Sequence, residues 1–332
     1  MNTPSLSTTT LGNTGLAVTR IGLGLAALGR PAYITLGRDT DLGPERDRAT
    51  MEQRCHVMLD AAYGAGVRYV DTARSYGRAE EFLASWLRSR AIAPDALTVG
   101  SKWGYRYTGA WDMDAAVHET KDHSLAMFRD QLPQTTALLG SHLDLYQVHS
   151  ATLESGVLDD PAVLRALAEL GDNGVAVGLT VSGPRQADVV RHALELGVEG
   201  VNPFSTVQAT WNVLEPSVGP ALEEARARGW GVLVKEALAN GRLTGRGHDR
   251  ATSALEDVAV RHGASLDQVA IAAALGQPGA DVVLCGAVTG EQLASNLAAL
   301  ELSLTEEDWD RLASVAEDAT DYWDRRSALP WS

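Results

Sequence analysis

The feature that most limits the fold of this chain is a regular alternation of short β-prone runs with stretches rich in Ala, Leu, Glu and Arg. Strands that alternate with helices in this way pair in parallel. The predicted strands are Thr19–Gly24, Arg68–Asp71, Leu97–Ser101, Leu143–His149, Val175–Val181, Gly200–Gln208, Trp230–Lys235 and Asp281–Cys285. The predicted helices are Arg54–Gly64, Ala79–Arg90, Asp114–Gln131, Pro161–Asn173, Pro184–Leu196, Ser217–Arg228, Ser253–His262 and Glu291–Leu300.

Eight strand–helix units predict a closed (β/α)8 barrel of the TIM type. The alternative is an open, doubly wound sheet, which usually carries a GxGxxG turn after its first strand. The matching stretch here, Gly22 to Gly29, reads Gly-Leu-Gly-Leu-Ala-Ala-Leu-Gly and lacks that spacing. The predicted fold class is therefore α/β, with the strands closed into a barrel.

Three segments lie outside the alternation. Leu11–Ile21 predicts a hairpin around the turn Gly12–Gly15, in a position suited to plug the bottom of the barrel. Pro31–Thr50 is a long polar loop after the first strand, which barrel geometry places on the catalytic face. Leu302–Ser332 reads as a further helix and a tail. No segment resembles a linker, so residues 1–332 are predicted to form a single barrel domain.

Composition excludes several classes of protein. The net charge of −15 and the absence of a Lys/Arg run argue against a nucleic-acid partner, since binding phosphates needs a basic face. Two distant cysteines, Cys55 and Cys285, exclude a disulfide framework and a cysteine-based zinc site. The polar N-terminus does not resemble a signal peptide, and no apolar run is long enough to span a membrane. The expectation is a cytoplasmic protein; the oligomeric state stays open.

Residues of catalytic type follow three neighbouring predicted strands. Asp71 and Tyr76 follow the second strand, Lys102 the third, and His149 ends the fourth. In a barrel, such positions share one rim. A nearby ammonium favours the phenolate of a tyrosine and so lowers its pKa, which makes the tyrosine a better proton donor. A carboxylate would orient the ammonium, and a histidine would hydrogen-bond a carbonyl oxygen undergoing reduction.

Each of these residues also has a structural interpretation when taken alone. Asp71 could be a helix cap, Tyr76 a rim aromatic, Lys102 a solvated charge and His149 a hydrogen-bonded structural group. Four independent structural residues would rarely fall at the ends of successive strands, so the sequence favours a shared catalytic role for the set. The chain has only three lysines, at 102, 121 and 235, and one of them directly follows an apolar strand.

From about Leu11 to Leu312, the chain resembles the aldo-keto reductases. The stretch from Asp71 to Gly77, Asp-Thr-Ala-Arg-Ser-Tyr-Gly, is similar to the family's second-strand signature, and Lys102 and His149 complete its tetrad. The resemblance implies that Tyr76 is the general acid/base, that Lys102 lowers its pKa, that Asp71 pairs with Lys102, and that His149 orients the substrate carbonyl.

The resemblance also implies a nicotinamide dinucleotide held without a Rossmann motif. Matching positions for carboxamide contacts are Thr180, Ser182 and Gln208, and the turn through Gly24, Leu25 and Ala26 would lie near the nicotinamide. The positions that match the family's remaining cofactor contacts are Lys235, Gly286, Gln292 and Asn296. NADP(H) is the cofactor expected from the family, with NAD(H) as the alternative.

Two departures from the family pattern concern the cofactor. Many members place an aromatic residue after the seventh strand to stack on the nicotinamide, and this chain has Lys235 there. Members that use NADPH commonly carry Arg or Lys near the segment 286–289, which has no cation here. Unpaired phosphate charge is unfavourable, so the charge would have to come from elsewhere, with Arg242 and Arg246 as candidates.

The remaining candidates concern the substrate and metals. Trp103, Trp211 and Trp331 are predicted near the rim, where each is a candidate for the wall of a substrate pocket or for packing under a loop. His118 and His123 have poor spacing for a metal, and His56, His192 and His262 lie on predicted helices. No metal is expected.

The leading hypothesis is therefore an NAD(P)-dependent oxidoreductase that interconverts an aldehyde or ketone, or a sugar, with its alcohol. Oxidation of aldoses at C1 is the alternative direction of the same chemistry. A regulatory barrel that binds the cofactor with little turnover, similar to relatives that serve as channel accessory subunits, is the second class. A metal-dependent hydrolase barrel is the third, and it has only Asp71 and His149 as ligands.

Overall fold

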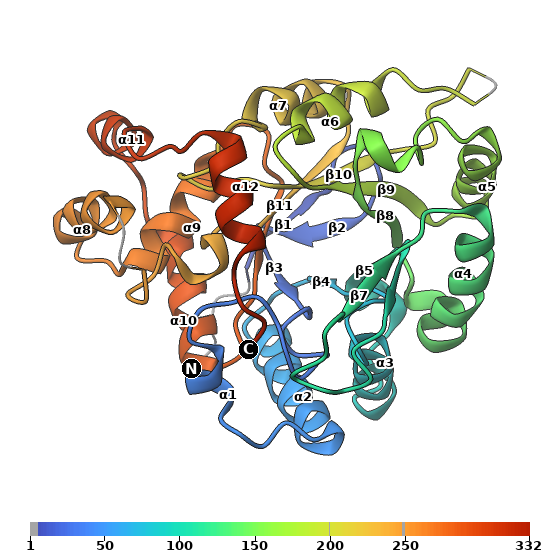
Figure 1. Cartoon of the computed structure of the whole chain (residues 1–332), viewed down its shortest axis with the longest axis horizontal. Coiled ribbons are helices and arrows are strands. Elements are labelled where there is room, and N and C mark those ends of the chain that lie inside the picture. The colour runs from blue at the N-terminus through green and yellow to red at the C-terminus, as the bar shows by residue number, and fades with distance from the viewer. Residues whose placement is uncertain (1–5, 199, 248–249) are drawn as a thin grey trace.

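Eight parallel strands form a closed barrel, as Figure 1 shows from the side of α12. The computed structural model describes residues 6–198, 200–247 and 250–332, so the first five residues of the polar N-terminal stretch lie outside it. Around the barrel the strands are β3 (Ile21–Gly24), β4 (Tyr69–Asp71), β5 (Thr98–Trp103), β8 (Leu145–Ala151), β9 (Ala176–Val181), β10 (Thr206–Thr210), β11 (Gly231–Lys235) and β12 (Val282–Cys285). The (β/α)8 prediction is confirmed.

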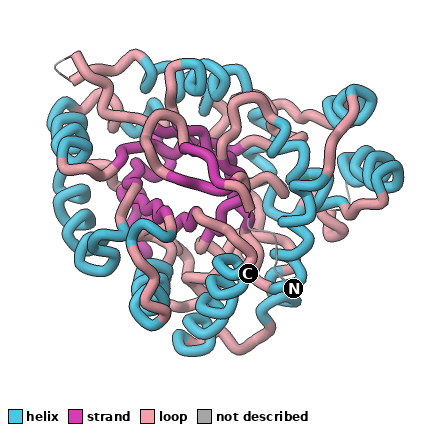
Figure 2. Tube along the Cα trace, turned by 180° about the vertical axis from the view of Figure 1, so that it is seen from behind, coloured by secondary structure: helices cyan, strands magenta, loops and turns pink. Residues whose placement is uncertain are grey.

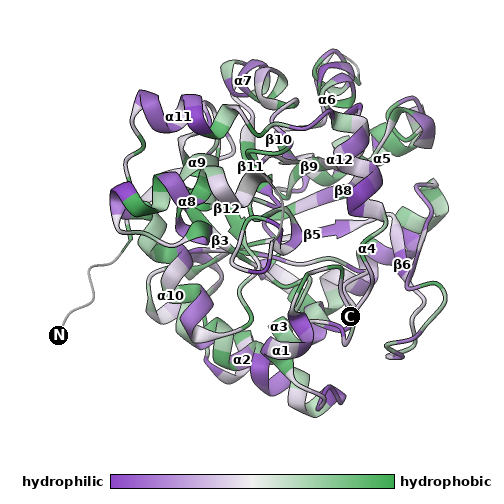
Figure 3. Cartoon of the chain, turned by 60° about the vertical axis from the view of Figure 1, so that its left-hand side comes forward, coloured by the Kyte–Doolittle hydropathy of each residue, from purple (hydrophilic) through white to green (hydrophobic). Residues whose placement is uncertain are grey.

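Helices surround the strands, as Figure 2 shows from behind, and many carry hydrophilic residues on their outer faces (Figure 3). Those that follow the strands are α2 (Arg48–Gly64), α3 (Ala79–Ser89), α4 (Leu125–Leu139), α5 (Pro161–Asp172), α6 (Gln186–Leu194), α7 (Gly219–Ala227), α9 (Leu266–Gly276) and α10 (Gly290–Ala298). Four others are α1 (Arg38–Leu42), α8 (Arg250–His262), α11 (Glu306–Ala313) and α12 (Ala319–Ser327). Among the described residues, no helix is both long and apolar enough to cross a membrane.

Three sequence predictions need correction. The helix expected from Asp114 begins only at Leu125, where the Ser124 hydroxyl accepts a hydrogen bond from Met127 N. The residues before it belong to a rim hairpin of β6 (Tyr105–Tyr107) and β7 (Glu119–Lys121), whose backbone groups pair with each other. The strand expected from Gly200 begins at Thr206, because Val201 pairs with Val198 in an isolated bridge and Phe204 N donates to the Asn202 side chain. Helices α9 and α12 were not predicted.

The predicted N-terminal hairpin is present as β1 (Thr8–Thr10) and β2 (Ala17–Thr19). Leu11 and Val18 pack, fully buried, in an apolar cluster with four side chains of the barrel interior, which are Tyr69, Leu145, Leu233 and Val282. The hairpin thus closes the bottom of the barrel, and catalytic groups are left to the opposite end.

Within this hairpin, Gly12 lies very close to the backbone of the barrel strand β11. Its φ is +51°, and a Cβ there would lie 2.2 Å from the backbone nitrogen of Gly231. Gly12→Ala should therefore lower the free energy of unfolding by about 2–5 kcal/mol, measured by chemical denaturation. Gly15→Ala is the matched control: its φ is +80°, but nothing lies within 4 Å, so only backbone strain of about 1–2 kcal/mol is expected. Equal losses of unfolding free energy in the two variants would contradict the close packing of the hairpin against the barrel at Gly12.

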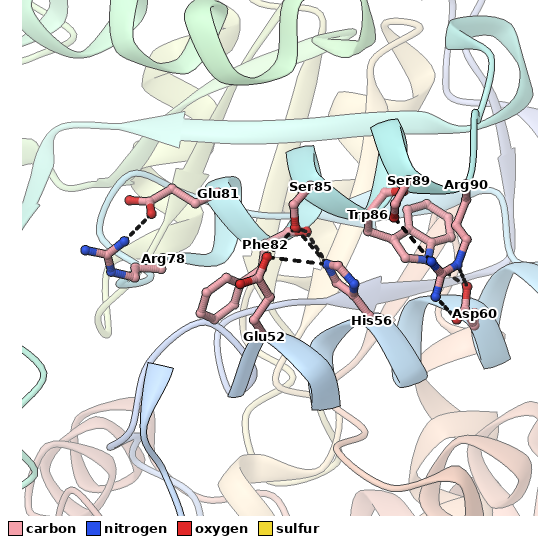
Figure 4. Close-up of polar contacts among 10 residues, drawn as sticks. All are labelled: Glu52, His56, Asp60, Arg78, Glu81, Phe82, Ser85, Trp86, Ser89 and Arg90. Carbon is pink, nitrogen blue, oxygen red and sulfur yellow. Dashed lines mark hydrogen bonds and ion pairs between the residues drawn. The ribbon is translucent and has the colours of Figure 1, made fainter. Parts of the chain in front are cut away.

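Polar contacts join helices α2 and α3 on the outside of the barrel (Figure 4). His56 Nε2 lies 2.8 Å from Ser85 Oγ and 3.1 Å from the Phe82 carbonyl, and the indole of Trp86 donates to Asp60 at 2.8 Å. His56 therefore has a structural role in holding α3.

Candidate functional site

A cavity of about 830 Å³ opens at the C-terminal ends of the strands. Asp71, Tyr76 and His149 line it, and Lys102 lies behind them, buried. Two of these residues lie inside longer strands than predicted, because β5 extends to Trp103 and β8 to Ala151. The structure thus brings together the four residues that the sequence placed on one rim.

Lys102 and Asp71 form a buried ion pair. The ammonium donates to Asp71 Oδ2 and, at 2.8 Å, to the carbonyl of Thr72. The other carboxylate oxygen, Oδ1, accepts from Gln208 Nε2 at 2.9 Å. Both charged groups therefore have satisfied polar partners, which is what makes a buried ion pair tolerable.

Tyr76 is held in place by a close approach of two loops. Gly77 has φ +61°, and a Cβ there would lie 2.4 Å from the carbonyl of Gly29, which in turn accepts from Arg78 N at 2.7 Å. This contact sets the phenol ring with its centroid 4.7 Å from Lys102 Nζ and 5.4 Å from the His149 ring. Only glycine tolerates this backbone geometry without strain.

Burial raises the pKa of Tyr76 well above its ordinary value, with the Asp71 carboxylate adding to the effect. The expectation of a lowered pKa is therefore not met in this structure. Asp71 neutralises the Lys102 charge, and the cation that opposes the rise is Arg30. At neutral pH the phenol keeps its proton.

His149 is a neutral imidazole. Burial lowers its pKa well below the ordinary value, and the cations Lys102, Lys235 and Arg30 lower it further. Its Nδ1 lies 3.4 Å from the Ser75 hydroxyl. If that hydroxyl donates to Nδ1, the hydrogen resides on Nε2, which then can donate to a ligand.

Sequence reasoning missed Arg30. The buried guanidinium lies 5.1 Å from the centroid of the Tyr76 ring and is fixed by an ion pair with Glu119 at 2.6 Å. It also lies over two rim aromatics, with 4.8 Å to the Tyr33 ring and 4.9 Å to the Trp331 ring. The chain has many arginines, and only the fold distinguishes this one.

The chain end forms part of the cavity wall. Backbone groups of Tyr33 and Ser332 exchange hydrogen bonds of 3.0 and 3.1 Å. The neighbouring indole, Trp331, stacks on the His118 ring at 4.2 Å and lines the cavity. Trp103 and Trp211, the other tryptophans expected at the pocket, are buried in the core and do not line it.

Most residues assigned to the cofactor by resemblance share the same cavity. These are Gly24, Ala26, Thr180, Ser182, Gln208, Lys235, Gly286, Gln292 and Asn296; Leu25 is instead buried in the core. Gln208 is engaged with Asp71, as described above, and the Thr180 hydroxyl accepts from Ser150 N at 2.6 Å. Lys235 Nζ donates to Thr210 Oγ1 at 2.8 Å.

Comparison with known proteins decides the family. Residues 20–317 match the model of the Aldo/keto reductase family. The chain belongs to this family. It is 25% identical to aldo-keto reductase YhdN of Bacillus subtilis over 93% of each chain, and 24% identical to pyridoxal 4-dehydrogenase of Microbacterium luteolum over 92% of this chain and 96% of that one.

The solved structure of aldo-keto reductase AKR11C1 from Bacillus halodurans, in its holo form, has the same fold. Its TM-score is 0.69 at 21% identity, and the similarity covers 95% of this chain and 97% of that one. As an aldo/keto reductase, the protein is an NAD(P)-dependent oxidoreductase of carbonyl compounds and alcohols.

A residue that was not identified from the sequence, Arg38, makes the cavity of this aldo/keto reductase suitable for a dinucleotide. Arg38 lines the cavity and is buried, yet its Nε and Nη1 have no hydrogen-bond partner. Burial and the neighbouring cations Arg46 and Arg30 lower its pKa to about 9. A buried cation with unsatisfied donors favours an anionic ligand, and the phosphates of a dinucleotide are of that kind.

The two arginines expected to replace the missing phosphate contacts are engaged with acids. Arg246 lines the cavity and pairs with Asp41, which comes from the long loop after β3. Arg242 pairs with Glu317 at 2.5 Å. Within the described part of the chain, no cluster of His, Cys, Asp and Glu is suited to a metal ion.

Proposed function

We propose that this aldo/keto reductase reduces an aldehyde or ketone to its alcohol with NADPH, and that Tyr76 supplies the proton. The observation that carries the proposal is the convergence of Tyr76, His149 and the Lys102–Asp71 pair on one wall of the cavity. Each comes from the end of a neighbouring strand or its loop, where barrel enzymes place their catalytic groups.

Each of these residues has a separate proposed role in carbonyl reduction. The dinucleotide, when bound, supplies a hydride to the carbonyl carbon. The carbonyl oxygen lies between Tyr76 and His149, where the neutral imidazole donates a hydrogen bond and stabilises the developing negative charge. Tyr76 then transfers its hydroxyl proton to that oxygen, which completes the alcohol. Arg30 stabilises the phenolate left behind, and Lys102 offsets the Asp71 carboxylate that would otherwise destabilise it.

Reduction takes a proton from the phenol of Tyr76, whereas alcohol oxidation needs the phenolate as a base, so a protonated Tyr76 is the form that the reductive direction uses. The substrate end of the cavity carries the aromatic rings of Tyr33, Tyr105 and Trp331. Such walls suit a ring-shaped carbonyl compound, either a sugar or an aryl aldehyde.

Arg38 supports binding of a phosphate-bearing dinucleotide, because its unsatisfied guanidinium can pair with phosphate charge, and NADP(H) is proposed over NAD(H) on the family expectation. Titration with NADPH and NADH, followed by nicotinamide fluorescence, should show binding of both with tighter binding of NADPH. Arg38→Met should weaken NADPH binding by about 10–100-fold, since charge-assisted hydrogen bonds contribute roughly 1.5–3 kcal/mol.

The outcomes separate the candidate functions. Binding of neither dinucleotide would overturn the proposal. Binding without turnover on a panel of aldehydes, ketones and sugars would instead favour a regulatory barrel that senses the cofactor. Turnover only with sugar and oxidised cofactor would favour aldose 1-dehydrogenase activity.

A further inference from the structure

Lys235 is a cation of the cavity wall without a carboxylate partner among the described residues. It ends β11, and its ammonium donates to the neutral hydroxyl of Thr210 at 2.8 Å. The acid next to it, Glu236, pairs with Arg326, whose Nε lies 3.0 and 2.9 Å from the two carboxylate oxygens, and it reaches Lys235 only through the Thr210 hydroxyl, which donates to Glu236 at 3.2 Å. The positive charge of Lys235 is therefore only partly compensated.

Strand β10 places this charge close to the proposed catalytic groups. Gln208 and Thr210 are two residues apart, so their side chains lie on the same face, roughly 7 Å apart. Gln208 contacts Asp71, and Thr210 contacts Lys235. Lys235 also contributes to the lowered pKa of His149. The charge thus acts at the end of the cavity where hydride transfer has to occur.

Hydride transfer changes the charge of the nicotinamide ring. The reduced ring is neutral, whereas the oxidised ring carries a positive charge. A nearby ammonium repels the oxidised ring and leaves the reduced ring almost unaffected.

We propose that Lys235 makes the site discriminate between the redox states of the cofactor, so that the reduced form binds more tightly than the oxidised form. The inference rests on the proposed function, since it requires the nicotinamide to reach Tyr76 and His149. It suits the reductive direction, in which the oxidised cofactor is a product that has to leave.

The discrimination should depend on pH. Burial lowers the pKa of Lys235 to about 8, so the ammonium is charged at pH 7 and largely neutral at pH 9.5. Binding of the oxidised cofactor should therefore tighten as the pH rises. The groups that face Lys235 are Thr210, Glu236, Trp323, Arg326, Lys102, Asp71 and His149.

Several of these groups keep one charge state over that range. Glu236, with its pKa lowered to about 2, stays ionised, and Arg326, with its pKa raised, stays cationic. His149, with its pKa lowered, stays neutral. Lys102 also has a lowered pKa, so variants at position 235 are needed to assign the effect.

The test measures the dissociation constants of NADP⁺ and NADPH by calorimetry at pH 7 and pH 9.5. In the unmodified protein, the ratio Kd(NADP⁺)/Kd(NADPH) should fall with rising pH. Lys235→Met removes the charge at similar length and should lower the ratio at pH 7 by about 10–100-fold, with no pH dependence. Lys235→Arg keeps the charge and should hold the ratio high at both pH values.

Arg191→Met is the control, because Arg191 lies on α6 and its partly exposed guanidinium pairs with Glu224 at 2.7 Å, away from the cavity lining. It should leave the ratio unchanged. If Lys235→Met weakens both forms equally, Lys235 is a structural anchor of β10 and the inference is wrong. If the unmodified protein binds neither form, the proposed function itself fails.

Discussion

Replacement of Tyr76 by phenylalanine is expected to lower kcat for carbonyl reduction by about 10²–10⁴-fold, the usual contribution of a positioned proton donor. The ring itself is retained, so its contacts with Lys102 and His149 are preserved. Binding of NADPH should change by less than about threefold, because only one hydroxyl is removed. Steady-state kinetics and a fluorescence titration on the same preparation measure the two effects.

Tyr63→Phe provides the matched control for this variant. Tyr63 lies on α2, where its ring packs against Trp86 at 5.8 Å, away from the cavity. The same chemical change there should leave turnover intact. If Tyr76→Phe retains most of the turnover, the proton comes from another group, and the assignment of Tyr76 is wrong.

The second large effect is expected for Lys102→Met. This change leaves Asp71 buried without its ammonium, and an unpaired buried charge typically costs about 3–5 kcal/mol of stability. Chemical denaturation should show this loss, and carbonyl reduction should fall as strongly as in Tyr76→Phe, because the Asp71 carboxylate then acts on the phenolate without its counter-ion.

The double variant Asp71→Asn/Lys102→Met separates stability from catalysis. It removes both charges, so most of the lost stability should return, because a neutral pair has no uncompensated charge. Activity should not return. Recovery of both properties would show that the ion pair only maintains the fold, and absence of a stability loss in Lys102→Met would show that Asp71 is compensated by other groups.

The barrel was predictable because its signal is repeated eight times, so that an error in one element does not change the fold. Boundaries were less predictable where tertiary contacts decide them. The stretch before Leu125 has helical composition, but pairing between β6 and β7 takes up its backbone groups. Likewise, α12 is short and polar, and its position over the cavity depends on contacts such as the Arg326–Glu236 pair.

The candidate site was predictable for residues at strand ends and for Tyr76, which belongs to the family signature in the loop after β4, but not for the arginines after β3. Asp71, Lys102 and His149 lie on or beside strands, whose direction follows from the fold. Arg30 and Arg38 belong to the region after β3, and they reach the cavity only because that region folds back over the barrel. The sequence placed the loop that contains Arg38 on the catalytic face, but it did not show which arginines of this region reach the cavity. The net effect on the pKa of Tyr76 likewise depends on burial, which sequence spacing does not show.

The backbone pairing of Tyr33 with Ser332 joins two loop segments in the cavity wall, apart from the strands that carry the proposed proton-transfer groups. The wall proposed to face the substrate is assembled from the loop after β3, the β6–β7 hairpin and residues near Trp331, whereas the proposed proton-transfer groups stand on the strands and the loop after β4. Insertions or substitutions in the first three segments can alter which carbonyl compound is accepted without moving Lys102 or His149. Diversification of such a protein would therefore be expected at its loops and its chain end, with one unchanged chemistry beneath them.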